Sequence, residues 1–166
     1  MQYLVSEEDI KGAKWPHDLF LINLIFNHIL MFVAFLTASS LWQWVVLVPI
    51  ASLLILAYTF WRARRSLTVD SWYVKCHWQI CHKRSMMFIG MIVLMLLAMV
   101  AIILVSGGNP KPQHIALGGA AVLPTMVMVL ILIVFETEAL DDARKGRVPD
   151  SMVKRFPEGQ YEPMKS

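Results

Sequence analysis

The amino-acid sequence predicts an all-α integral membrane protein, a bundle of four transmembrane helices. Four apolar runs contain no charged side chain, and each has about 20 residues, the length of helix that crosses a hydrocarbon layer of roughly 30 Å. Hydrophobic residues make up 57% of the 166 residues and charged residues only 16%, against about 25% charged in a soluble domain. No run alternates apolar with polar residues, which excludes a membrane β-barrel.

The four predicted spans occur in two closely spaced pairs. They cover residues 19–38, 42–61, 85–106 and 116–135. Residues 39–41 join the first pair, and a segment rich in Gly and Pro, residues 107–115, joins the second. These spans leave too little chain for a separate soluble domain. We therefore expect a single membrane domain over residues 1–166, with residues 136–166 as a tail outside the lipid.

The distribution of Lys and Arg predicts the orientation of the bundle. Fourteen of the fifteen cations lie in the N-terminal segment, in the loop between the second and third spans, or in the tail. Lys111 alone lies in a connection on the opposite side. Positive charge marks the cytoplasmic side, so both termini are expected to be cytoplasmic, in a bacterial-type inner (plasma) membrane. The polar first 14 residues lack the pattern of a cleavable signal peptide.

The segments outside the spans carry several helix signals. Ser6, followed by three acidic residues, predicts the start of an N-terminal helix, and Gly146 is the expected C-cap of an elongated fourth helix. Between the second and third spans we expect a short amphipathic cytoplasmic helix or an inward extension of the third span. Its apolar residues, at helical spacing, are Val69, Trp72, Tyr73, Cys76 and Ile80. An extended tail is expected around Pro149, Pro157 and Pro163.

The first span contains a polar cluster, the first candidate site. Asn23 and Asn27 lie one helical turn apart and share a face, and His28 lies roughly 14 Å into the span, near the middle of the bilayer. These side chains either fix helix packing through interhelical hydrogen bonds, or His28 binds haem, contacts a quinone or relays protons. No other span has a histidine at that depth, so a haem would need its second ligand from a partner subunit.

Two Cys-His pairs form the second candidate site. Cys76, His77, Cys81 and His82 are ligand types that both zinc and Cu(I) accept. On a continuous helix, residues five positions apart differ in direction by about 140°, so only His77 and Cys81 share a face. The alternative to metal binding is a buried cysteine on the apolar face and histidines at the membrane surface.

The third candidate is a row of methionines at i+4 spacing in the third span. The row consists of Met87, Met91, Met95 and Met99. Thioether sulfur binds Cu(I), so such a row could conduct copper. Methionine also fills irregular gaps between apolar helices, and packing is the expected role.

Two prolines are expected to bend the second and fourth spans at the same depth. Pro49 and Pro124 each remove a backbone hydrogen bond from a helix. Small residues just before Pro124, at positions 118–121, permit close contact between helices. The paired bends would either shape a small outward cavity near His114 or serve packing alone.

Taken together, these patterns predict a non-catalytic accessory or assembly subunit of a larger inner-membrane complex. No span contains a charged residue of the kind that ion carriers usually need, and no catalytic motif is present. We expect a lipid bilayer environment, contacts with other membrane-protein subunits or self-association, no resident cofactor and no nucleic-acid partner. The alternatives are a small transporter or channel for a soft metal such as Cu(I), and a redox subunit that contacts haem or a quinone.

Overall fold

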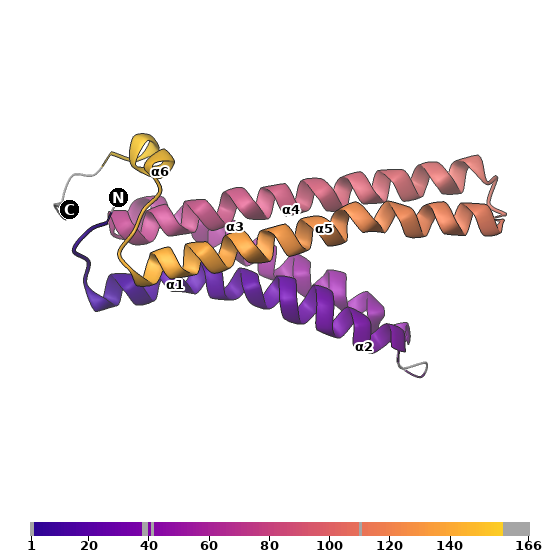
Figure 1. The fold of residues 1–166 in the computed structure, drawn as a ribbon, viewed down its shortest axis with the longest axis horizontal. Helices are drawn as coiled ribbons and strands as arrows, with labels where there is room; N and C mark the ends of the chain where they lie inside the picture. Colours follow the sequence, from indigo (N-terminus) through magenta and orange to yellow (C-terminus); the bar gives the residue numbers. More distant parts are fainter. Residues whose placement is uncertain (1, 38–39, 41, 110, 158–166) are drawn as a thin grey trace. The chain divides into compact units, whose positions relative to one another are not determined.

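The computed structural model describes residues 2–37, 40, 42–109 and 111–157, and within these ranges the chain is helical without a β-strand (Figure 1). An isolated antiparallel bridge joins Gln2 to Arg147. The elements in order are α1 (Glu7–Leu21), the π-helix η1 (Ile22–Met31), α2 (Phe32–Thr37), the 3-10 helix η2 (Trp42–Val46), α3 (Leu47–Val69), α4 (Trp72–Val105), α5 (Pro112–Arg144) and α6 (Asp150–Arg155).

Three helices are long and apolar enough to cross a membrane. Among the described residues these are α3, α4 and α5. The all-helical fold class is confirmed, and three helices have the length and composition of membrane spans. The first predicted span is divided among the 15-residue α1, the 10-residue η1 and the 6-residue α2. A fourth span and the orientation of the bundle therefore remain predictions.

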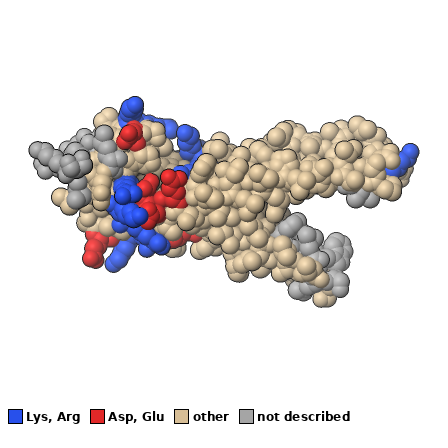
Figure 2. All heavy atoms as spheres, viewed as in Figure 1, with Lys and Arg blue, Asp and Glu red and all other residues tan. Residues whose placement is uncertain are grey.

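The chain forms two compact units. The first, called the core unit, consists of Met1–Lys83 and Ile133–Ser166, and the second, the hairpin unit, of Arg84–Leu132. All twelve carboxylate side chains belong to the core unit, and the hairpin unit has only Arg84 and Lys111 as cations. Figure 2 shows that the charged side chains of the core unit gather at one end of it.

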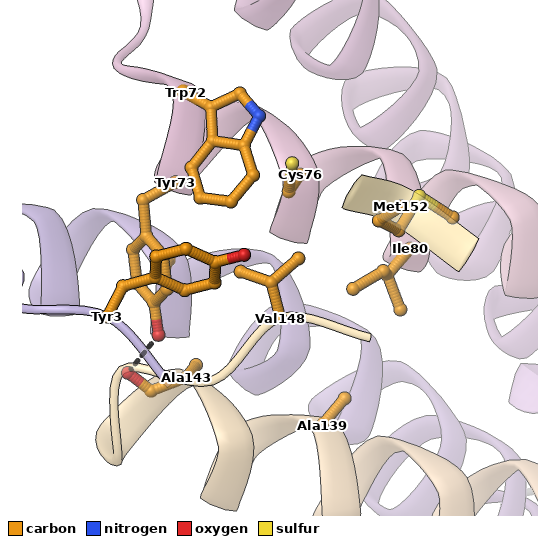
Figure 3. Close-up of a cluster of buried hydrophobic side chains, with 10 residues drawn as sticks. Tyr3, Trp72, Tyr73, Cys76, Ile80, Ala139, Ala143, Val148 and Met152 are labelled. Carbon is orange, nitrogen blue, oxygen red and sulfur yellow. Dashed lines mark hydrogen bonds between the residues drawn. The ribbon is translucent and has the colours of Figure 1, made fainter. Parts of the chain in front are cut away.

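A cluster of buried hydrophobic side chains packs inside the core unit (Figure 3). Tyr3 meets Trp72 edge to face at 5.0 Å between ring centroids, and the Tyr73 hydroxyl donates to the Ala143 carbonyl at 3.0 Å. The other members of the cluster are Ala13, Cys76, Ile80, Ala139, Val148 and Met152. The cluster thus ties the N-terminal segment, α1, α4, α5 and α6 together.

The predicted helix boundaries at Ser6 and Gly146 are confirmed. The Ser6 side chain accepts the Asp9 backbone N–H at 3.1 Å and caps α1. Just after α5, Gly146 has a φ of +69°, the left-handed conformation that favours glycine. Its carbonyl accepts the Tyr3 N–H at 2.8 Å. A Cβ at position 146 would lie 2.6 Å from the Tyr3 carbonyl oxygen, so the close approach also requires glycine.

Of the two alternatives for the segment between the second and third spans, the inward extension of the third span is confirmed, because this segment is the start of the 34-residue α4. The separate short helix is therefore wrong. The break falls at Asp70, where a bidentate bond from Arg62 (2.6 and 2.8 Å) holds the end of α3. Two further predictions need correction. The tail is not wholly extended, because α6 follows Pro149, whose fixed φ suits a helix start. Pro49 was predicted to bend the second span. It lies in the first turn of α3, where backbone N–H groups have no partner within the helix, so its missing N–H removes no helical hydrogen bond.

Parts of the predicted connections lie outside the described residues. These are residues 38, 39 and 41 of the first connection and its flank, residue 110 of the second, and residues 158–166 of the tail, including Pro163.

Candidate functional site

Three buried titratable side chains lie in a hydrogen-bonded line inside the core unit. His17 Nδ1 lies 2.5 Å from Glu136 Oε2, and His17 Nε2 lies 3.0 Å from His77 Nδ1. His77 Nε2 faces the backbone carbonyl of Arg147 at 3.2 Å. The three residues are fully buried, with 0% exposure each. We call this set, His17, His77 and Glu136, the buried triad.

Each member of the triad comes from the inward face of a different helix. His17 lies on the buried face of α1 with Ala13, Pro16 and Phe20, at the i+3 and i+4 spacing of one helix side. Glu136 lies on α5 between the buried Leu132 and Ala139. His77 lies one turn after Tyr73 on α4, and the two rings meet at 4.8 Å between centroids. The helix packing of the core unit therefore places the triad.

In the triad, the Glu136 carboxylate is hydrogen-bonded to the His17 imidazole, which in turn contacts the His77 imidazole. A buried ionised carboxylate needs a hydrogen-bonded or charged partner, and His17 supplies it for Glu136 at 2.5 Å. Both nitrogens of both imidazoles face a polar atom. Such a line of hydrogen-bonded titratable groups can hold and pass protons.

The polar cluster predicted in the first span packs η1 against α3. Asn23 Nδ2 donates to Ser52 Oγ at 3.1 Å, and Asn27 Nδ2 donates to the Val48 carbonyl at 2.9 Å and to Asn23 Oδ1 at 3.2 Å. His28 Nδ1 donates to the Asn23 carbonyl at 2.9 Å, five residues earlier in the π-helix. These contacts favour the packing interpretation. A haem or quinone role for His28 stays a prediction.

The structure gives the four Cys and His residues of α4 separate contacts. His77 belongs to the buried triad, and His82 meets the ring of Phe60 at 4.9 Å. Cys81 Sγ donates to the Pro16 carbonyl at 3.3 Å, while Cys76 lies in the hydrophobic cluster. Across the described parts of the chain, no group of three or more His, Cys, Asp or Glu is arranged to hold a metal ion. A copper or zinc site here stays a prediction.

Most of the methionine row lies between the two helices of the hairpin unit. Met91 and Met95 of α4 line a small space of about 150 Å³ with Ala121, Pro124 and Thr125 of α5, together with Leu94 and Ala98. Met99 Sδ would lie 3.7 Å from a Cβ built on Gly118. Met87 is 42% exposed. These contacts are those of packing methionines, and a copper path along the row stays a prediction.

A shallow apolar groove runs along α5 in the hairpin unit. It has a volume of about 520 Å³ and is lined only by apolar side chains. The lining residues are Ala120, Leu123, Pro124, Val127, Met128 and Ile131. They form two adjacent rows at i+4 spacing, with Pro124 inside the helix as the sequence predicts. The predicted cavity near His114 is not this groove, because His114 does not line it.

The buried triad was not predicted from the sequence. Its only signals were the positions of His17, two residues before the first apolar run, and of Glu136, directly after the last one, which the predicted topology places at the same membrane edge. Pairing these ends with His77 depends on which helix faces meet, and periodicity alone does not give that.

Comparison with protein-family models, with curated proteins and with solved structures found no match to this chain.

Proposed function

We propose that the protein is a non-catalytic accessory or assembly subunit of a larger inner-membrane complex, and that α5 of the hairpin unit contacts the partner. The observation that carries the proposal is the apolar groove along α5. The partner is a membrane protein that seats an apolar transmembrane helix in this groove.

The shape of the groove suits a helix. Ridges along i±4 rows of one helix pack into the grooves between such rows on another. One row of the α5 groove passes through Ala120, Pro124 and Met128, and the neighbouring row starts at Leu123. Within a bilayer, helices associate by close packing rather than by the hydrophobic effect. A groove that matches the surface of a helix therefore favours contact with another helix over contact with lipid chains.

Small residues on exposed faces of the hairpin unit support the same interpretation. Gly90 of α4 and Gly119 of α5 have no atom within 4 Å of the place where a Cβ would lie. A glycine inside a helix costs about 1 kcal/mol relative to alanine, and close approach of a second backbone is the usual compensation in membranes. Moreover, only 6% of the most apolar 18-residue stretch of α4 is buried within the chain.

The test is affinity purification of the tagged full-length protein from native membranes in mild detergent, with quantitative mass spectrometry. We expect the unmodified protein to retain a membrane-protein partner in fixed stoichiometry. Ala120→Trp fills the groove and should lower that retention at least about tenfold, which is the effect of about 1.4 kcal/mol.

Leu130→Trp is the matched control, because Leu130 is 56% exposed on the same helix and does not line the groove. This variant should retain the partner. The proposal fails if the protein elutes alone or as a homo-oligomer, or if both tryptophan variants retain the partner equally.

A further inference from the structure

We propose that the end of α3 and the short α6 together form a binding site for the phosphate headgroup of an anionic phospholipid. The site, called the basic patch, consists of the exposed side chains of Arg64 and Arg65 on α3 and of Arg155 on α6. The lipid lies with its phosphate against these guanidinium groups and with its acyl chains along the exposed apolar face of α3. This inference concerns the core unit and does not depend on the partner proposed for the hairpin unit.

The exposed face of α3 changes in character along the helix axis. Leu54, Tyr58 and Trp61 follow one another at spacings of four and three residues and are all exposed, which places them on one side of the helix. Arg64 and Arg65 continue this side and lie about 5–6 Å beyond Trp61 along the axis. The helix α3 is long and apolar enough to cross a membrane. An order from leucine through aromatic residues to arginine is typical of a helix that leaves the hydrocarbon for the headgroup layer.

Local contacts hold this end of α3 in place. The Arg65 guanidinium lies over the Trp61 ring, 5.5 Å from the ring centroid, a cation–π contact. Arg62 donates to both carboxylate oxygens of Asp70, the residue that follows the helix. The helix is therefore continuous past the arginines of the basic patch, and their side chains extend from an ordered backbone.

The charge balance around the basic patch is strongly positive. Residues 62–84 contain six cations and one carboxylate, Asp70, and Arg62 binds both oxygens of that carboxylate. Within the part of the chain that the structure describes, no carboxylate forms an ion pair with any of the three arginines of the patch. The carboxylates of the core unit lie mainly on α1 and α5 instead. The patch therefore favours an anion from outside the chain.

Arginines from two different helices converge on the same part of α4. The charges of Arg64 of α3 and Arg155 of α6 both act on the ring of His82. The helix α6 is held beside α4 by Met152, which belongs to the same hydrophobic cluster as Ile80 (Figure 3). Like charges repel each other, so an anion that contacts both guanidinium groups stabilises their convergence.

The chemistry of the patch and of the face beside it selects the ligand class. Guanidinium groups donate paired hydrogen bonds that match the oxygens of a phosphate, and basic clusters directly beside a membrane span are typical of sites for anionic lipid headgroups. A soluble anion would contact the arginines alone, whereas a lipid also covers the exposed Leu53, Leu54 and Tyr58 of the same helix. A zwitterionic lipid has no net charge with which to balance the patch.

Native mass spectrometry of the full-length protein in detergent tests the basic patch with phosphatidylglycerol and with phosphatidylcholine of the same acyl chains. We expect the first phosphatidylglycerol to bind with the lower Kd. Arg64→Gln should raise the Kd for phosphatidylglycerol about fivefold, since an arginine near a lipid surface contributes about 1 kcal/mol, and should leave the Kd for phosphatidylcholine unchanged. Equal Kd values for the two lipids in the unmodified protein would overturn the proposal.

Arg144→Gln is the matched control, because Arg144 is also exposed and loses the same charge but lies on α5. This variant should retain the Kd of the unmodified protein for phosphatidylglycerol. Equal weakening by Arg64→Gln and Arg144→Gln would show that net charge alone attracts the lipid, which contradicts a defined site. Arg155→Gln, on a separate helix, should raise the Kd as Arg64→Gln does, so the result does not depend on the folding of one variant.

Two further measurements distinguish a lipid in the basic patch from a soluble anion. Inorganic phosphate at the concentration of the lipid should not displace phosphatidylglycerol, and displacement would assign the patch to soluble phosphate compounds instead. In phosphatidylcholine nanodiscs, phosphatidylglycerol brominated in its acyl chains should quench tryptophan fluorescence more than brominated phosphatidylcholine does. That difference should largely disappear in Trp61→Phe, because Trp61 is exposed one turn before the arginines. A difference that persists in full would place the lipid elsewhere on the chain and overturn the proposal.

Discussion

The helices of the core unit are joined by one kind of contact, and the helices of the hairpin unit by another. In the core unit, specific polar bonds join separate helices, as between His17 of α1 and Glu136 of α5 or between Asn23 of η1 and Ser52 of α3. In the hairpin unit, methionines and small residues pack α4 against α5, as Met99 does against Gly118. The first kind fixes which helix faces meet, and the second leaves an apolar surface available to a partner.

This difference has a physical origin. A hydrogen bond in a low-dielectric interior is strong, and an unmade one is costly, so polar pairs admit few alternative arrangements. Methionine side chains are flexible and adapt to irregular gaps. We therefore expect substitutions in the core unit to alter stability, and substitutions on the exposed face of the hairpin unit to alter partner binding.

The largest expected effect on stability comes from His17→Ala. The substitution leaves Glu136 buried without its 2.5 Å partner, and removal of one member of a buried pair costs about 3–5 kcal/mol. Thermal unfolding in detergent micelles should show a large decrease in the midpoint. The matched control is Glu138→Ala at an exposed position, which should stay within about 0.5 kcal/mol. Equal effects of the two substitutions would show that the triad does not hold the core unit together.

A second pair of substitutions compares the two units at positions of similar backbone conformation. Gly146 in the core unit has a φ of +69° and Gly107 in the hairpin unit a φ of +60°. An alanine at either position has the left-handed penalty of about 1–2 kcal/mol. Only at position 146 would the new Cβ meet another atom, the Tyr3 carbonyl oxygen at 2.6 Å.

Gly146→Ala should therefore lower the free energy of unfolding clearly more than Gly107→Ala does. The same thermal unfolding assay measures both, and loss of protection of the Tyr3 amide in hydrogen exchange would locate the damage. If the two variants were equally stable, the bond between Tyr3 and Gly146 would contribute little to the core unit.

The sequence predicted the elements better than it predicted their contacts. Hydropathy located α3, α4 and α5 because a long charge-free run has few alternatives to a membrane helix, and Ser6 and Gly146 marked helix ends because capping depends on local chemistry. The division of the first span into α1, η1 and α2 had no signal in the apolar pattern. The short α6 was also missed, since its stability comes from Met152 in the hydrophobic cluster.

The candidate sites show the same limit. Asn23 and Asn27 were recognised because amides in an apolar run need partners, although Ser52 and Val48 could not be named in advance. His77 was grouped with Cys76, Cys81 and His82 by proximity in sequence, whereas its contacts are with His17 and Arg147, 60 and 70 residues away. Contacts between distant segments follow from helix packing, which one sequence does not specify by periodicity.

The smallest expected effect comes from Ser52→Ala, which removes the hydroxyl that accepts from Asn23 Nδ2 at 3.1 Å. Interhelical hydrogen bonds within membranes contribute about 0.6 kcal/mol on average, because the freed group finds other partners. Asn23 still accepts from Asn27, so the midpoint of unfolding should decrease only slightly. Leu53→Ala, at a neighbouring 65% exposed position, controls for the loss of apolar contact. A decrease in the free energy of unfolding above about 2 kcal/mol in Ser52→Ala alone would mean that the polar bonds of η1 contribute as much to stability as those of the buried triad.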